Sequence, residues 1–286
     1  MKVVVIGSKG MLGRAVMDAC QRAGYEASGY NLPVLDIVRM DGREVEDCDW
    51  VVNCAAYTKV DMAETEPTEA FSVNAIGAGR VARMCRERGM KLIHISTDYV
   101  FDGQSRVAYR EGDQTNPLNT YGMSKFIGEV LALKECKQTC VVRTQSLFSG
   151  YGVSFAKTIL KKIKEGQKEF KVVDDQVSCP THVVHLACAL VRVMQAEEKG
   201  KDIYGILNIS ASDACSWYEF ARTIVAGVES GAGAEVKPIK SDELPKTSAL
   251  RPAFSVLCKD RFFDLTGLEM PGWRDGLNLF LRSEII

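Results

Sequence analysis

The chain has 286 residues, of which 46% are hydrophobic and 26% are charged, a composition typical of soluble globular proteins. The net charge of −1, without a long basic block, argues against nucleic acid or an anionic membrane as a partner, and no apolar run is long enough to span a bilayer. Ten dispersed cysteines without a CxxC pair indicate neither a zinc site nor a disulfide framework, and with no secretion signal they favour the cytoplasm.

Short apolar segments alternate with helical patterns through the first half of the chain. Strands are expected at 2–6, 26–30, 50–54, 91–96 and 139–143, and helices at 11–23, 68–88 and 121–133. Strands that alternate with helices predict right-handed βαβ units and a parallel sheet. Because the strands are almost continuously apolar, both faces of that sheet should be covered.

The pattern changes from about residue 149, where helices are separated by longer and less regular segments. These helices are expected at 154–165, 183–197 and 217–229. The β-branched run at 205–210 is expected to rejoin the sheet. We therefore predict an α/β protein with a Rossmann-type doubly wound parallel sheet in residues 1–147. Residues 148–286 are expected to form a smaller, mainly substrate-binding domain.

A glycine loop, Gly7-x-x-Gly10-x-x-Gly13, follows the first strand and opens the first helix. In that position the backbone can approach a dinucleotide pyrophosphate closely, and the helix N-terminus supplies positive potential. The alternative interpretation is a tight turn that serves only close packing of helix and strand.

The end of the second strand carries Tyr30-Asn31, where an acidic residue usually binds the ribose 2′-hydroxyl of NAD. Lys9, inside the glycine loop, is a candidate partner for a 2′-phosphate, and Asp36-Ile37 are candidates for an adenine contact. The sequence therefore favours NADPH over NADH as the cofactor and leaves NADH open.

Tyr121 and Lys125 are four residues apart in a predicted helix, so their side chains share one face, one turn apart. An ammonium beside a phenol favours the phenolate, and we expect it to lower the pKa of Tyr121 from the usual value of about 10. Such a tyrosine can give a proton to a carbonyl oxygen or take one from an alcohol. An exposed surface pair would have the same spacing, so other motifs must support this interpretation.

Further motifs follow the glycine loop in a fixed order across nearly the whole chain. They lie at 52–58, 60–64, 74–75, 96–101, 117–125, 143–144, 175–181, 217–218 and 251–252. Each is weak alone, but their order and spacing are specific. The chain resembles the extended short-chain dehydrogenase/reductases, and among them it is similar to the dTDP-4-dehydrorhamnose reductases.

The resemblance implies a role for each matching residue. Tyr121 would be the proton donor, Lys125 its partner and the ribose anchor, and Thr97 a hydroxyl that polarises the carbonyl. The cofactor would be held by Gly7, Lys9, Gly10, Met11, Leu12, Gly13, Asp36, Ile37, Cys54, Ala55, Ala56, Tyr121 and Lys125. The sugar would be contacted by Thr97, Asp98, Ser146, Gln176 and Arg251, with Pro180 and Thr181 as further candidates.

One position departs from the family. The reductases usually carry a tryptophan that stacks on the sugar two residues after the Arg143-Thr144 pair, and this chain has Ser146 there. Phe148 and Tyr151 are the candidates for the missing apolar surface. This difference does not affect the residues expected to carry the reaction, but it leaves the identity of the sugar nucleotide open.

The residues at the end of the fourth strand favour one reaction. Dehydratases of the extended family tend to have Thr-Asp-Glu where this chain has Thr97-Asp98-Tyr99, so elimination lacks its glutamate. The resemblance then implies NAD(P)H-dependent reduction of the C4 keto group of a nucleotide-activated 6-deoxy sugar, with dTDP-4-dehydro-L-rhamnose giving dTDP-L-rhamnose.

Two alternatives stay open. A nucleotide-sugar epimerase would use the same three residues. A non-catalytic NADP-binding subunit, similar to the beta subunit of methionine adenosyltransferase, would share the run 98–103. Some reductases of the family bind Mg²⁺ through acidic residues near a dimer interface, but this sequence indicates no metal ligands, and a homodimer is likewise left open.

Overall fold

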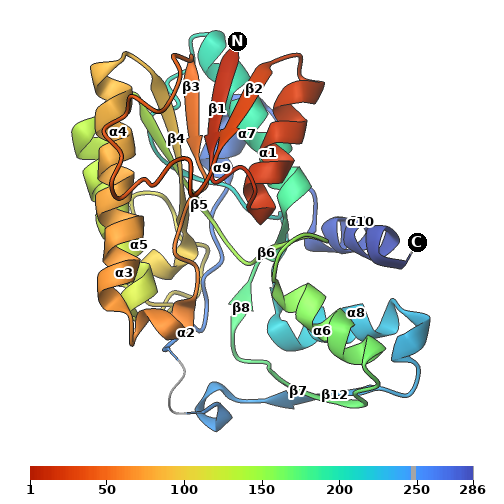
Figure 1. Ribbon diagram of the computed structural model, residues 1–286. Helices are drawn as coiled ribbons and strands as arrows, with labels where there is room; N and C mark the ends of the chain where they lie inside the picture. The colour runs from red at the N-terminus through yellow and green to blue at the C-terminus, as the bar shows by residue number, and fades with distance from the viewer. Residues whose placement is uncertain (246–248, 286) are drawn as a thin grey trace.

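A six-stranded parallel sheet is the centre of the computed structural model, which describes residues 1–245 and 249–285 (Figure 1). Its strands are β1 (Lys2–Ile6), β2 (Glu26–Tyr30), β3 (Trp50–Asn53), β4 (Lys91–Thr97), β5 (Thr139–Thr144) and β10 (Gly205–Asn208). They lie in the order β10-β5-β4-β3-β1-β2, and every neighbouring pair is parallel. The predicted Rossmann-type α/β fold is confirmed.

Helices cover both faces of this sheet. The long helices that do so include α1 (Met11–Arg22), α4 (Ala78–Glu87), α5 (Thr120–Glu135) and α7 (Val183–Glu198). α1 and α7 pack together on one face, and α4 and α5 pack together on the other. Along β1, Val3 and Val5 join the first core and Val4 and Ile6 the second. This alternation follows from the opposite directions of successive side chains in a strand.

The order of the strands reverses beside β1, because the chain places β2 on one side of β1 and β3 and β4 on the other. Ligands of open parallel sheets bind at the carboxyl ends of the strands at such a switch point. The glycine loop after β1 and the loop after β3 meet there, since the backbone of Ala55 lies directly against Gly7. The topology thus brings two of the predicted cofactor segments together.

The segment expected as one helix over 68–88 is divided into α3 (Pro67–Phe71), a π-helical turn η1 (Ser72–Gly77) and α4. Asn74, in the turn, is buried, and its amide bonds the backbone N and O of Tyr57 at 2.9 and 3.0 Å. The same amide donates to Ser124 Oγ at 3.0 Å. A π turn inserts one residue into the helical repeat, and such turns often accompany functional sites.

Residues beyond 147 form a second core around Phe148, Phe220, Trp273 and Phe280, in the lower and right-hand parts of Figure 1. The remaining elements are α2 (Val60–Ala63), β6 (Leu147–Phe148), α6 (Phe155–Lys164), β7 (Glu169–Val173), β8 (Val177–Ser178), β9 (Thr181–His182), β11 (Cys215–Ser216), α8 (Trp217–Ala226), β12 (Glu235–Ile239), α9 (Asp260–Thr266) and α10 (Trp273–Ile285), with short 3₁₀ turns between some of them. The same half of the chain also contributes α7 and β10 to the sheet layers, so the two parts are interleaved. Among the residues described, no helix is both long and apolar enough to cross a bilayer.

Candidate active site

The helix α5 begins at a cap that fixes the position of Tyr121. Asn119 Oδ1 accepts a hydrogen bond from Gly122 N at 2.7 Å, and Asn119 Nδ2 donates to Leu250 O at 2.7 Å. An asparagine cap of this kind satisfies one of the free N–H groups of the first helical turn. The Tyr121 ring meets the Tyr99 ring edge to face, with centroids 5.8 Å apart. The start of α5 is therefore tied both to the end of β4 and to the C-terminal part.

Lys125 is buried beneath Tyr121, and its Nζ donates to Ile95 O at 2.5 Å. Burial lowers the pKa of this ammonium to about 8, while the carboxylate of Glu129 and the thiol of Cys54 act in the opposite direction. An ammonium has three N–H donors, so two remain for a ligand beside the one that Ile95 receives. Lys125 is thus placed as expected for a group that anchors a cofactor.

The expected lowering of the Tyr121 pKa is wrong for the protein by itself. Burial raises the pKa of Tyr121 to about 12, the Thr97 hydroxyl opposes this shift, and the charge of Asp98 adds to it. Lys125, held by Ile95 O, is not among the groups that act on the phenol. The spacing of the pair is local, but the low dielectric around the ring comes from the tertiary packing. At neutral pH the phenol carries its proton, which is the form that a proton donor needs.

Thr97 and Asp98 form a short hydrogen-bonded chain at the end of β4. Thr97 Oγ1 donates to Asp98 Oδ1 at 3.1 Å and accepts from Tyr99 N at 3.2 Å. Gln145 Nε2 donates to Asp98 Oδ2 at 3.3 Å and to Ser255 O at 2.7 Å. Burial raises the pKa of Asp98 to about 6, against the effect of these donors. The structure therefore brings Thr97, Asp98 and Tyr121 together.

The glycine loop has the geometry of a cradle for a phosphate group. Gly7 has a φ of +81°, and a Cβ on it would lie 2.8 Å from Ala55 N. A Cβ on Gly13 would lie 2.7 Å from Ser8 Cα, so the first turn of α1 can press directly against the loop only with glycine there. The glycines thus leave the loop backbone accessible to a pyrophosphate, as the predicted dinucleotide cofactor requires.

Replacement of Gly13 by alanine should remove this close contact. We expect a loss of roughly 1–3 kcal/mol of stability, the usual cost of overpacking, together with loss of NADPH binding. Thermal melting and a fluorescence titration with NADPH would measure the two effects. Gly112→Ala is the matched control, because a Cβ at Gly112 meets open space. Unchanged NADPH affinity in a folded Gly13→Ala variant would contradict the cradle.

The place of the usual acidic residue is taken by a neutral amide. Asn31 Oδ1 accepts from Lys9 N at 2.9 Å, and Asn31 Nδ2 donates to Ser8 Oγ at 2.5 Å. Asn31 thus joins the end of β2 to the glycine loop, and the Lys9 side chain is exposed beside it. The neutral Asn31 side chain therefore carries no negative charge that would repel a 2′-phosphate.

The other predicted cofactor residues differ in accessibility. Met11 and Leu12 begin α1 directly after Gly10, and Cys54, Ala55 and Ala56 are half-buried in the loop after β3. Asp36 is half-buried, and its Oδ1 accepts from Val38 N at 2.9 Å. Ile37 packs in the core against Gly77, so its side chain offers no surface to a ligand. Only its backbone can serve the expected adenine contact.

A cavity of about 410 Å³ lies between the two parts of the chain, beside Tyr99. Arg251, Asp61, Gln176 and Trp217 line it. Arg251 Nη2 donates to the two carboxylate oxygens of Asp61 at 3.0 and 2.9 Å, and Gln176 Nε2 donates to Ser241 Oγ at 2.9 Å. The remaining lining residues are Phe155, Thr158, Ile159, Lys162, Gln167, Phe170, Lys171, Val172, Val173 and Leu244. A narrow extension of the cavity runs along Trp217, Gln176 and Tyr99 to Asp98 and Ser146.

Ser146 has a φ of 49°, which is uncommon for a residue other than glycine, and its Oγ lies 2.8 Å from Ser178 Oγ. Phe148 is buried in the second core and cannot contact a ligand. Tyr151 is exposed and has the Arg14 guanidinium over its ring at 5.3 Å, outside the cavity lining. The expectation that Phe148 or Tyr151 supplies the apolar surface is therefore wrong for Phe148 and unsupported for Tyr151.

The aromatic surface beside Ser146 comes instead from Trp217, whose ring centroid lies 4.6 Å from that of Phe155. In the sequence, Trp217 and Asn74 stand only within the motifs at 217–218 and 74–75, and Gln145 stands in none. The motif at 74–75 could have indicated Asn74 as a site residue, whereas no motif in the sequence indicates Gln145. Thr181 is buried and outside the cavity lining, where its hydroxyl donates to Cys179 O at 2.8 Å.

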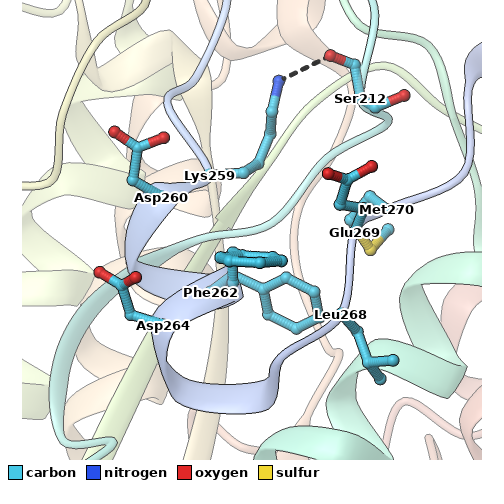
Figure 2. Close-up of a pocket in the computed structure, with 9 residues that line it drawn as sticks. Ser212, Lys259, Asp260, Phe262, Asp264, Leu268, Glu269 and Met270 are labelled. Carbon is cyan, nitrogen blue, oxygen red and sulfur yellow. Dashed lines mark hydrogen bonds between the residues drawn. The ribbon is translucent and has the colours of Figure 1, made fainter.

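A separate cavity of about 340 Å³ opens beside α9 (Figure 2). Lys259 Nζ donates to Ser212 O at its edge, and Phe262, Leu268 and Met270 line it. It shares no lining residue with the site of Tyr121. Over the described ranges, no group of three or more His, Cys, Asp or Glu side chains is arranged to hold a metal ion.

Comparison with known proteins agrees with this geometry. Residues 1–285 match the family described as RmlD substrate binding domain. The chain belongs to this family. The resemblance predicted from the motifs is thereby confirmed.

Relatives of the RmlD family align with the chain from end to end. A spore coat polysaccharide biosynthesis protein of Bacillus subtilis is 35% identical over 99% of this chain and 97% of its own length. The crystal structure of a dTDP-4-dehydrorhamnose reductase from Clostridium acetobutylicum has a TM-score of 0.90 and 32% identity, covering 100% of both chains. That of a dTDP-4-dehydrorhamnose reductase from Bacillus anthracis, in complex with NADP, has a TM-score of 0.87 and 34% identity over 99% of each chain.

Proposed function

We propose that this chain is an NADPH-dependent reductase of the C4 keto group of a nucleotide-activated 6-deoxy sugar, converting dTDP-4-dehydro-L-rhamnose to dTDP-L-rhamnose. The observation that carries the proposal is that Tyr121, Lys125 and Thr97 gather around the carboxyl end of β4, where Asp98 and Tyr99 line a cavity that also has Trp217 and Arg251 on its walls. The dTDP-4-dehydrorhamnose reductases among the relatives support the same activity.

Each of the three residues has a distinct part in this reduction. Bound NADPH supplies a hydride to the carbonyl carbon. Tyr121, protonated at neutral pH, gives its proton to the carbonyl oxygen. Thr97 lies beside the phenol and orients the Tyr121 hydroxyl, and its own hydroxyl is held by Asp98 Oδ1 through the 3.1 Å hydrogen bond. Lys125 fixes the cofactor ribose with the two N–H donors that Ile95 O leaves free.

The preference for NADPH rests on charge. Asn31 is neutral and the Lys9 side chain beside it is exposed and cationic, so this position favours a 2′-phosphate over a bare 2′-hydroxyl. The relative from Bacillus anthracis, solved with NADP, supports this preference. We propose further that residues 1–147 bind the cofactor, that residues 148–286 mainly bind the sugar nucleotide, and that the protein acts in the cytoplasm, where ten unpaired thiols stay reduced.

Arg251 is proposed to bind the anionic part of the sugar nucleotide from its place on the cavity wall. Arg251→Gln should raise KM for the sugar nucleotide by roughly tenfold to a hundredfold, the usual cost of a lost charge-assisted hydrogen bond, with a smaller change in kcat. Initial rates at varied substrate would show this effect. Arg192→Gln, at an exposed arginine of α7, is the control, and an unchanged KM in Arg251→Gln would exclude the contact.

A panel of 4-keto-6-deoxy nucleotide sugars, each with NADPH and with NADH, tests the proposed function directly. We expect oxidation of NADPH with dTDP-4-dehydro-L-rhamnose and formation of dTDP-L-rhamnose, identified by NMR. An epimerase would interconvert sugar isomers without net consumption of cofactor. Tight NADPH binding without any turnover would favour the non-catalytic regulatory subunit.

A further inference from the structure

A buried ion pair stands directly below the catalytic residues on α5. Glu129 lies one turn beyond Lys125, as Lys125 lies one turn beyond Tyr121, so the three side chains follow one face of the helix. Arg143 Nη2 donates to Glu129 Oε2 at 2.7 Å, and its Nε approaches both carboxylate oxygens at 3.0 and 3.3 Å. Glu129 is 1% and Arg143 3% exposed. Because this buried ion pair is held by several charge-assisted hydrogen bonds, it fixes the position of α5 relative to β5.

The pair joins α5 to the strand that carries Thr97. Ser96 Oγ donates to Glu129 Oε1 at 2.6 Å, and Arg143 of β5 lies beside Ser96 in the sheet register. The Arg143 guanidinium also stacks over the Phe101 ring at 5.0 Å and donates to Glu111 O. Glu129 therefore fixes α5 to Ser96 of β4, the residue before Thr97. This contact helps to set the distance between Tyr121 on α5 and the Thr97 hydroxyl on β4.

The same carboxylate lies one helical turn from the buried Lys125, and its charge acts on the Lys125 ammonium. Lys125 is 2% exposed, and within residues 1–245 and 249–285 its Nζ has one hydrogen bond, to Ile95 O, which offsets only part of the loss of its hydration. The other titratable groups around it are Tyr121 on the same helix, Cys54 from the loop after β3, and His94 from β4. Burial raises the pKa of the Cys54 thiol to about 12 and lowers that of His94, so both are neutral and Glu129 is the nearby anion.

We propose that Glu129, held by Arg143 and Ser96, is a positioning residue that fixes α5 to β4 and thereby sets where the Lys125 ammonium meets Ile95 O and the cofactor. The inference rests on the proposed role of Lys125 as the anchor of NADPH. Because burial lowers the pKa of Lys125 to about 8 and Glu129 opposes that effect, removal of the carboxylate should lower it further. NADPH binding should then weaken at a lower pH than in the wild type.

The test compares NADPH affinity from pH 6 to pH 9.5 in wild type, Glu129→Gln and the double variant Glu129→Gln/Arg143→Met. Glu129→Gln leaves the Arg143 charge buried and unpaired, which can prevent folding, whereas the double variant removes both charges and avoids this cost. The double variant also lacks the carboxylate that opposes the lowering of the Lys125 pKa, so a shift in the same direction is expected. The control is Glu135→Gln on the same helix, where the glutamate pairs with Arg83 and Arg86 at the surface.

We expect the alkaline loss of NADPH affinity to begin roughly one pH unit lower in the variants, which makes binding about tenfold weaker at pH 8 to 9. kcat should follow the same shift, and Glu135→Gln should match the wild type. A folded variant whose alkaline limit is unchanged would overturn the inference, as would failure of both variants to fold, which would assign the pair to stability alone.

The two proposals can fail separately. A wild type that binds NADPH with the expected alkaline limit but reduces no sugar nucleotide would refute the proposed function, while the shift in the Glu129 variants would still support the inference. Conversely, normal turnover together with an unchanged pH dependence in the variants would leave the function standing and remove the positioning role of Glu129.

Discussion

Tyr121→Phe is expected to lower kcat by roughly a hundredfold or more, as for other lost acid catalysts, while the fold and NADPH binding are retained. The phenyl ring keeps the edge-to-face contact with Tyr99, so only the hydroxyl that protonates the substrate oxygen is lost. Stopped-flow or steady-state oxidation of NADPH with the sugar nucleotide measures the rate, and fluorescence titration measures the cofactor affinity.

The control for this variant is Tyr25→Phe, which removes a hydroxyl that donates to Glu198 near the surface, away from the cavity. The wild type should also show no loss of activity that reflects ionisation of Tyr121 below about pH 10, because burial raises its pKa to about 12 and the acid form persists through that range. Rates close to wild type in Tyr121→Phe would refute the assignment of the proton donor.

Lys125→Met is expected to weaken NADPH binding by roughly tenfold to a hundredfold, the value of hydrogen bonds made by a charged group, and to lower kcat as well. Methionine keeps most of the volume of the buried side chain but carries no donor for a ribose. Because the change also removes a buried charge, the melting temperature should fall little or not at all. Cofactor titration measures the NADPH affinity, initial rates measure kcat, and thermal melting measures the stability.

Lys134→Met, at an exposed lysine of the same helix, is the matched control. The wild-type enzyme should lose NADPH affinity as the pH rises through about 8, since the pKa of Lys125 lies there and only the protonated form donates three hydrogen bonds. Lys125→Met should bind weakly at every pH without that dependence. A retained alkaline loss in Lys125→Met would assign the titration to another group.

Local patterns in the sequence were sufficient for the sheet, the glycine loop and the helical spacing of the catalytic pair. Strand and helix periodicity depend on neighbours within one or two turns, so the parallel sheet and the helix at Tyr121 could be predicted from composition and period alone. The glycines at 7 and 13 carry the same kind of local information, because the lack of a side chain is a property of the residue itself.

The tertiary structure decided the protonation of the site and the composition of its walls. The pKa of Tyr121 rises and that of Lys125 falls because packing removes both groups from water, and burial is not readable from a four-residue spacing. Trp217, Arg251 and Asp61 meet in one cavity only because α8, the C-terminal segment and α2 converge on it. Likewise, the π turn that places Asn74 against Ser124, and the ion pair of Glu129 with Arg143, depend on contacts between residues far apart in the chain.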